Sequence, residues 1–462
     1  MKIQTKLLAA TVIPLVLTGC NGSMESLTGY AASMMCSKTF VTGLDQETIY
    51  TEDLIPITDG NVELTNTRID LSNKSVTSSI FNVSNTAVYR DGFGCTLVGE
   101  DGVAALLDKT PSAYPPAHLD SQVYWPFGAA GIDPTDAVYD EALTAIVVPH
   151  FTEFKEYQVK THSVAVVHQG RLVYEKYAED YSPDTPIYGF SVAKTVSALF
   201  AGVLYDQGLL KLDQPTGLPY WQADNSDIRN AITPRQLLNM TSGLDFDESL
   251  VDPESDANLL FVADDMAAFS ADQPSKYAPG SDFYYSTGDT MVLSSLLTQL
   301  SGGSLEAVYD KLQLDLLQRL NANASIIQSD SAGNLVFGMQ GLFGTQDLAR
   351  LGQLLLNDGA WDGQQLVSPE WISIMSTPVP FSDDLGYTYG TGIWLNSGQH
   401  GNKFLPSLPD DTLIAFGLRG QFVIASKSLD MVIVRTGSTM DAYDFIADMD
   451  AFAAQIVNIV KN

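Results

Sequence analysis

The chain of 462 residues exceeds one ordinary domain, and a composition that is 45% hydrophobic and 17% charged can bury a substantial core. That composition excludes disorder, collagen and coiled coil. Twenty-four Lys and Arg against 55 Asp and Glu give a formal charge of −31 at pH 7, which repels phosphate backbones, so we expect no nucleic-acid partner.

The first residues have the layout of a secretory signal. Lys2 and Lys6 precede an apolar run from Leu7 to Leu17. The run is shorter than the roughly 20 residues that a membrane-spanning helix needs, and Pro14 interrupts it, which argues against a permanent transmembrane anchor. We therefore expect residues 1–19 to direct export and to be removed.

The end of this segment, Leu17-Thr18-Gly19-Cys20, resembles the bacterial lipobox. The resemblance implies cleavage before Cys20 and a diacylglycerol on its sulfur, so that a lipid holds the mature protein to a membrane. Asn21 stands where retention in the inner membrane is associated with aspartate, which favours the outer membrane of a Gram-negative cell, facing the periplasm. A plain signal peptide with a coincidental cysteine is the alternative.

Residues 20–130 form the next segment, which we call the N-terminal extension. Alternating stretches such as Val62-Glu63-Leu64 and Ala87-Val88-Tyr89, with a turn signal at Asp91-Gly92, predict that it is rich in strands. Its last part is rich in proline and is typical of a linker that wraps onto the following unit. We place a domain boundary near residue 131.

Two cysteines remain once Cys20 is set aside. Cys36 and Cys95 are an even pair in a chain that we expect to enter an oxidising compartment. We predict a structural disulfide between them that staples the N-terminal segment. Two buried free thiols are the alternative, because connectivity alone does not set the distance between them.

Residues 131–462, the larger unit, begin with helical spacing at 136–148 and a hairpin signal, in which the strand-like runs 163–167 and 171–174 flank a turn. Helical spacing then dominates and strands return near the C-terminus, so we expect one sheet assembled from both ends of the unit around a largely helical insertion. The expected helices cover residues 192–203, 234–240, 290–300, 305–317, 346–356, 369–375 and 443–460, and the expected late strands cover 412–416, 422–425 and 431–434.

Ser191 and Lys194 open the apolar helix, and their i, i+3 spacing puts both side chains on one helical face. An amine there can accept the hydroxyl proton if burial lowers its pKa. A serine in the first turn also lies where the helix dipole and free backbone N–H groups stabilise a developing negative charge. The pair predicts a nucleophile and its base; an N-terminal serine beside a solvated lysine would have the same spacing.

Two later segments could complete such a site. Tyr285 precedes another apolar helix, and a phenol held against an ammonium group loses its proton more easily, which makes it a second candidate base or a proton relay. The stretch Phe416-Gly417-Leu418-Arg419-Gly420-Gln421 leads into a strand that could offer a backbone N–H to an oxyanion hole together with Ser191. The alternatives are that Tyr285 is an ordinary aromatic residue at a helix entrance and that the glycines of the second stretch mark a β-bulge.

These elements, in this order, resemble the serine beta-lactamase and penicillin-binding-protein family, especially its class C-like serine hydrolases. The segments 208–215, 233–244 and 343–350 also resemble members of that family, so the resemblance runs from about residue 131 to 455. It implies an α+β fold of the α/β-sandwich type, with an antiparallel sheet built from N- and C-terminal segments and a helical insertion.

The resemblance also implies roles for single residues. Ser191 would be the nucleophile, Lys194 and Tyr285 would share general-base and general-acid work, and the backbone N–H groups of Ser191 and Gln421 would hold the oxyanion. An acyl-serine intermediate would be cleared by water. No metal and no organic cofactor is expected.

The segment Tyr285-Ser286-Thr287-Gly288-Asp289-Thr290 resembles the 6-aminohexanoate-dimer hydrolase branch more than the beta-lactamases, which usually show asparagine where Thr287 stands. The beta-lactamases also carry lysine or histidine at the position of Leu418, where the charge meets a substrate carboxylate. Arg419 is adjacent, but neighbouring strand residues point to opposite faces. From this comparison we expect Thr287, Arg419 and Gly420 to contact the substrate, and beta-lactam hydrolysis is not favoured.

Other enzyme classes fit less well. Gly189-Phe190-Ser191-Val192-Ala193 nearly matches the G-x-S-x-G elbow of alpha/beta-hydrolases, but the final glycine is missing, no strand pattern precedes Ser191, and His400 is the only later histidine. A zinc hydrolase is not favoured either, because His118, His150, His162, His168 and His400 form no ligand pattern.

We therefore expect a lipid-anchored serine hydrolase that cleaves small esters or amides. Two alternatives stay open: a catalytically quiet binding lipoprotein on the same scaffold, since fold does not guarantee function, and a D-alanyl peptidase or penicillin-binding enzyme.

Overall fold

The computed structural model describes residues 19–152, 160–380, 386–398, 402–439 and 445–461. Residues 1–18 of the expected signal peptide and the side chain of Cys20 lie outside what the structure describes. Within the described ranges, no helix combines the length and the apolar character that crossing a membrane requires.

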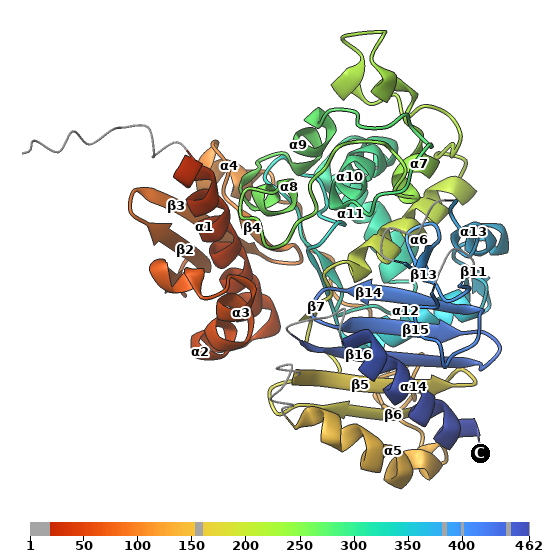
Figure 1. Cartoon of the computed structure of the whole chain (residues 1–462). Helices are drawn as coiled ribbons and strands as arrows, with labels where there is room; N and C mark the ends of the chain where they lie inside the picture. Colours follow the sequence, from red (N-terminus) through yellow and green to blue (C-terminus); the bar gives the residue numbers. More distant parts are fainter. Residues whose placement is uncertain (1–18, 153–159, 381–385, 399–401, 440–444, 462) are drawn as a thin grey trace, which may run out of the picture.

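A seven-stranded antiparallel sheet forms the lower part of the larger unit in Figure 1, below the helical insertion, with the strand order β12-β13-β14-β15-β16-β5-β6. Its β5–β6 hairpin comes from the start of the unit and β14 to β16 come from its end, which confirms the sheet predicted from both ends. The strands are β5 (Lys160–His168), β6 (Arg171–Tyr177), β12 (Thr388–Tyr389), β13 (Trp394–Leu395), β14 (Thr412–Gly417), β15 (Gln421–Ser426) and β16 (Met431–Ser438).

Helices cover both faces of this sheet, because its central strands are apolar on both sides. In β5, Val164 and Val166 belong to the core of one face, whereas Ala165 and Val167 belong to the core of the other. The first face packs against α5 (Asp140–Val147) and α14 (Phe445–Lys461), and the second packs against α12 (Thr345–Leu356). The fold is therefore α+β, as predicted.

The insertion between β6 and β12 is mainly helical and includes a small sheet of strand order β7-β9-β8. At its centre lies α6 (Val192–Asp206), which is buried almost all round and carries Lys194. The remaining elements are β7 (Ile187–Tyr188), α7 (Pro234–Leu238), α8 (Asp256–Leu259), α9 (Met266–Asp272), α10 (Thr287–Ser301), α11 (Leu305–Leu312), β8 (Ile326–Ile327), β9 (Gly341–Phe343), β10 (Ala360–Trp361), β11 (Gln364–Gln365) and α13 (Pro369–Met375).

The N-terminal extension is only partly a strand-rich segment. Ala87-Val88-Tyr89 lies in a strand as predicted, but the part before Asn66 is helical and Val62-Glu63-Leu64 lies in a 3-10 turn. The long helix α1 packs on the four-stranded sheet, so the sheet buries one apolar face. The elements are α1 (Gly19–Ser37), α2 (Gln46–Ile49), α3 (Ile55–Ile57), β1 (Asn66–Asp70), β2 (Ser75–Ile80), β3 (Val83–Arg90), β4 (Gly94–Leu97) and α4 (Gly102–Asp108).

Cys36 and Cys95 form the expected disulfide, which joins the end of α1 to β4 with the two Cα atoms 6.0 Å apart. The apolar core of the N-terminal extension extends into the larger unit. It continues into Tyr188, Phe190 and Leu342 of the larger unit, which belong to the same buried apolar cluster. The extension therefore packs directly against the segment that leads to Ser191.

Candidate active site

The residue before Ser191 has a strained backbone. The chain leaves β7, passes through Gly189, and reaches Phe190 with φ of +48°, a left-handed conformation that a bulky residue rarely adopts. Close packing explains the glycine at position 189, because a Cβ there would come within 2.5 Å of the Phe343 ring. Ser191 then stands at the N-cap position of α6, where backbone N–H groups lack intrahelical acceptors.

Lys194 is one turn further along α6 and only 2% exposed. Its Nζ contacts Ser191 Oγ at 3.1 Å, Thr287 Oγ1 at 3.0 Å and the Gly338 carbonyl oxygen at 2.6 Å. Burial lowers the pKa of Lys194 to about 8, and the charge of Glu248 opposes this change. The amine is therefore within reach of the serine hydroxyl and partly neutral near neutral pH.

Glu248 is a member of the site that the sequence analysis did not find. It is half-buried, and its carboxylate accepts hydrogen bonds from both the backbone N–H of Thr287, at 2.7 Å, and the Thr287 hydroxyl. Burial raises the pKa of Glu248, and the charge of Lys194 opposes this change. Glu248 follows the family-like segment 233–244 by four residues, so proximity to that segment was the available signal.

Tyr285 comes into contact with the same group. Lys194 Nζ lies 4.9 Å from the centre of the Tyr285 ring, and that ring stacks on Trp394 at 5.4 Å with an interplanar angle of 17°. Ser286 caps the following helix α10 by accepting a hydrogen bond from Asp289 N, which holds the preceding phenol near Lys194. The predicted hydroxyl, amine and phenol ring therefore meet in one place.

A cavity of about 490 Å³ opens above Ser191. Tyr285, Thr287 and Glu248 line it together with mainly apolar and aromatic side chains. Within the described part of the chain, no lysine or arginine is among its lining residues, whereas Asp247 and Glu248 are. A cavity of this size and character suits a small, largely apolar ligand.

Two predicted substrate contacts, Arg419 and Gly420, and the predicted oxyanion donor Gln421 are not among the residues that line this cavity. The side chain of Arg419 is buried and donates to the Glu52 carbonyl oxygen of the extension. Gly420 faces the opposite way, since a Cβ there would lie 2.5 Å from Arg435. Gln421 is the first residue of β15 after the turn, where it pairs with Gly417 of β14, and its side chain bonds to Gly437 on the other side.

The cavity is lined instead by Phe416 and Leu418 of the same turn. The reason is register: the hairpin turns at residues 418–420, so β14 separates Gln421 from the cavity. The strand β13 pairs only with Leu413 and Ile414 of β14, which leaves the rest of that edge toward the cavity. Thr287 does line the cavity and contacts Lys194, and its contact with a substrate stays a prediction.

The structure gives little support to an alpha/beta-hydrolase or a zinc hydrolase. The two-residue strand β7 does precede Ser191, contrary to the sequence prediction, but it belongs to the small sheet and not to the central one. His400 lies outside the described residues. His162 is buried and stacks on Tyr181 at 4.4 Å, and no group of three or more possible metal ligands occurs among the residues that were placed.

Known proteins resemble this chain in sequence and in fold. The family described as Beta-lactamase matches residues 147–435. The 6-aminohexanoate-dimer hydrolase of Paenarthrobacter ureafaciens is 23% identical over 304 residues, which are 61% of this chain and 73% of that protein.

Two solved structures show the same fold. The structure titled "Putative 6-aminohexanoate-dimer hydrolase from Bacillus anthracis" has a TM-score of 0.56 at 18% identity, covering 77% of this chain and 89% of its own. A family VIII carboxylesterase has a TM-score of 0.55 at 17% identity, covering 70% and 99% respectively.

Proposed function

The chain belongs to the beta-lactamase family of serine hydrolases, and from this premise we propose that it cleaves small esters or amides through an acyl-serine intermediate. The observation that carries the proposal is the position of Lys194 Nζ, buried and 3.1 Å from the Ser191 hydroxyl. The esterase and amide hydrolase among the similar proteins support this substrate class.

In the proposed mechanism, neutral Lys194 takes the Ser191 hydroxyl proton while the serine oxygen bonds to the substrate carbonyl carbon. The oxyanion is held by the N–H of Ser191 and, in place of the expected Gln421, by the N–H of Leu418 in the turn that lines the cavity. Lys194 and Tyr285 return the proton to the leaving group as the bond to it breaks. Water then attacks the acyl carbon, and its proton returns by the same groups to Ser191.

The charges of the cavity favour substrates without a carboxylate. Beta-lactams and D-alanyl peptides carry one near the reacting bond, and a buried carboxylate needs a cationic partner. The described cavity lining holds Asp247 and Glu248 but no lysine or arginine. The charge of this lining therefore suits neutral substrates, and substrates with an amino end, better than it suits penicillins.

Export and a lipid anchor on Cys20 are part of the proposal. The secretory layout of residues 1–19 supports export, and the disulfide between Cys36 and Cys95 is typical of an oxidising compartment. We expect the protein in the membrane fraction and Cys20→Ser in the soluble fraction of the same cells. An unchanged distribution would contradict the lipid anchor.

Labelling with a fluorophosphonate tests the enzymatic proposal against a quiet binding protein. We expect labelling of the folded protein, none in Ser191→Ala, and turnover of p-nitrophenyl acetate lowered by at least about two orders of magnitude in Lys194→Ala. Lys211→Ala, at an exposed lysine just beyond α6, is the matched control and should retain full activity. No labelling of the folded wild type would favour the binding protein.

A further inference from the structure

Part of the cavity wall comes from the N-terminal extension. Tyr30 of α1 and Ile57 at the end of α3 line the cavity beside residues of the larger unit. Tyr30 is 8% exposed and meets Phe261 edge to face, with the ring centres 5.0 Å apart. A segment outside the matched family region therefore limits the space above Ser191.

Most of the apolar lining residues belong to two separate apolar clusters. Tyr285, Trp394 and Phe416 belong to the cluster that fills one face of the central sheet. The second cluster is the core of the extension, and it includes Tyr30, Ile57, Phe190, Phe261 and Leu418. The cavity therefore has a side beside the phenol and a side bounded by the extension.

The chemistry assigns these two sides. In the mechanism proposed above, Lys194 and Tyr285 protonate the leaving group, so the leaving group departs on the side of Tyr285 and Trp394. The acyl carbon is bonded to Ser191 with its oxygen near Leu418, and the acyl chain then extends toward Phe190 and the extension. That side is apolar, which matches a hydrocarbon chain.

We propose that the N-terminal extension forms the acyl subsite of this enzyme and that Tyr30 and Ile57 set the length of the apolar acyl chain it accepts. This inference rests on the proposed hydrolase function and specifies its substrate class. Esters and amides of medium-length aliphatic acids would be favoured, with the limit on chain length set by side chains outside the matched family region.

The extension is held firmly enough to act as a wall. The backbone of α1 touches its neighbour closely at Gly29, where a Cβ would lie 2.1 Å from the Phe261 carbonyl oxygen. A methyl group cannot fit there, so α1 sits as close to the larger unit as the two backbones permit.

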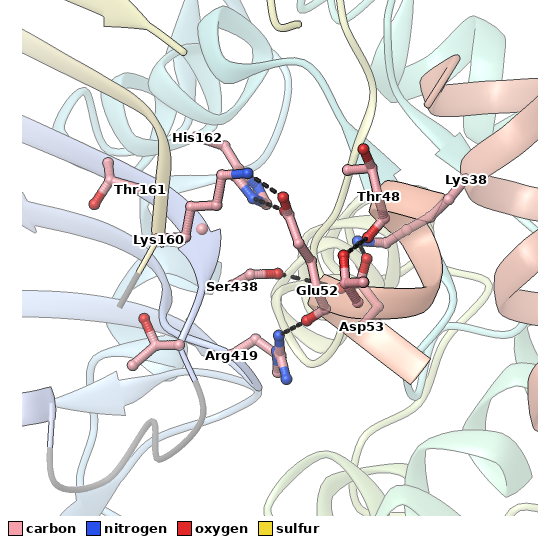
Figure 2. A network of polar contacts seen from close by, with 12 residues as sticks. Lys38, Thr48, Glu52, Asp53, Lys160, Thr161, His162, Arg419 and Ser438 are labelled. Atoms are coloured by element: carbon pink, nitrogen blue, oxygen red, sulfur yellow. Dashed lines mark hydrogen bonds and ion pairs between the residues drawn. The ribbon is translucent and has the colours of Figure 1, made fainter. Parts of the chain in front are cut away.

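A polar network adds a second attachment (Figure 2). Glu52 of the extension pairs with Lys160, its carboxylate lies 3.7 Å from His162 Nε2, and its carbonyl oxygen accepts a hydrogen bond from Arg419. Arg419 belongs to the same turn as Leu418, so the extension also holds the turn that lines the cavity.

The neighbouring Asp53 strengthens this attachment from inside the extension. It pairs with Lys38 at 2.6 Å and accepts a hydrogen bond from Ser438 of β16 at 3.2 Å, and both charged side chains are buried. The ion pair with Lys38 fixes the Asp53 carboxylate where it accepts from Ser438, and separating the two units would break that buried hydrogen bond.

The test is a series of p-nitrophenyl esters with acyl chains from acetyl to decanoyl. We expect Tyr30→Ala and Ile57→Ala to raise kcat/KM for long chains relative to acetyl by about tenfold or more, and Ile57→Trp to lower the same ratio. Ile49→Ala is the matched control, because Ile49 is buried in the same cluster but does not line the cavity. Its ratio should equal that of the wild type.

A second series, acetate esters of alcohols of increasing length, separates the two sides of the cavity. We expect the kcat/KM ratios across these acetate esters to be the same in the Tyr30 and Ile57 variants as in the wild type. A change in these ratios, with unchanged ratios in the acyl series, would overturn the assignment of the extension to the acyl side. Unchanged ratios in both series would overturn it as well. If Tyr30→Ala does not fold, Ile57→Trp at a half-buried residue gives the test with the opposite sign.

Failure of the proposed function has a different signature. Labelling by a small fluorophosphonate does not depend on acyl length, so wild type and all Tyr30 and Ile57 variants should label at Ser191 whatever the outcome of the ester series. Absence of label in the wild type would refute the hydrolase, whereas label with unchanged acyl preference would refute the subsite alone.

Discussion

At the scale of single residues, the hydrogen bonds of Lys194 have assignable directions. The Gly338 carbonyl can only accept, and Thr287 uses its hydroxyl proton on Glu248, so its oxygen accepts from Lys194 as well. A neutral amine has two N–H donors, and these two contacts use both. In the structure Lys194 also donates to Ser191 Oγ, as the ammonium form with its third N–H can. Once that proton is lost, the lone pair of the neutral amine is left facing the Ser191 hydroxyl, which is the direction that proton abstraction requires.

Glu248→Gln tests this arrangement through the pH profile. The negative charge of Glu248 raises the pKa of Lys194, so its removal should lower that pKa below about 8 and move the acid limb of kcat/KM to lower pH. A glutamine can also donate to Thr287 and free its hydroxyl to compete for the lysine lone pair, so we expect the plateau to fall about tenfold. Measuring kcat/KM from pH 5 to 10 checks both effects.

Glu254→Gln is the control for that experiment, because Glu254 is an exposed acid in the same loop. It should leave the profile unchanged. A lower plateau in Glu248→Gln with an unmoved acid limb would assign Glu248 a purely structural role and contradict the orientation described above.

At the scale of elements, α1 docks through a surface on which glycine is required at one position. Gly29 faces the Phe261 carbonyl with no room for a methyl group, whereas a Cβ at Gly22 in the same helix would make ordinary contacts at 3.7 Å or more with Glu254. The two positions have the same helix propensity but different surroundings.

We expect Gly29→Ala to destabilise the protein by about 1–3 kcal/mol, because the helix must move away from its neighbour. Gly22→Ala should leave stability unchanged or raise it by up to about 1 kcal/mol through helix propensity. Urea unfolding of the two variants measures the difference. Equal stabilities would show that α1 does not pack against Phe261 as closely as described.

At the scale of the whole molecule, the excess of acidic residues extends into the interior. Burial raises the pKa of Asp289 and of Asp330 to about 7 and that of Asp347 to about 6. The folded protein then binds more protons than the unfolded chain between pH 4 and 7. Stability therefore falls as the pH rises through this window.

His162 acts in the opposite direction, because burial lowers its pKa to about 4 and so favours unfolding below pH 6.5. Burial also lowers the pKa values of His150 and His168, which adds to this effect. The three buried aspartates have the larger influence, and we expect the free energy of unfolding to be lower at pH 8 than at pH 5.5 by on the order of 2 kcal/mol. Urea unfolding at the two pH values measures this difference in stability. Asp289→Asn should reduce the difference between pH 5.5 and pH 8. A protein that is more stable at pH 8 would contradict the prediction.

The sequence by itself determined what depends on near neighbours in the chain. The i, i+3 spacing of Ser191 and Lys194, the helix that follows, the β5–β6 hairpin and the late strands all follow from local periodicity, and the family-like order of Ser191, Lys194 and Tyr285 indicated the site. The pairing of Cys36 with Cys95 followed from simple counting.

Only the tertiary structure decided which distant residues complete the site. A difference in hairpin register exchanges Leu418 for Gln421 at the cavity, and periodicity does not fix where a turn begins. Glu248 and Tyr30 show no local pattern, since their roles arise from loops and helices brought together by packing. Contacts between such distant segments depend on the shapes of whole elements, and shape is a property of the folded chain.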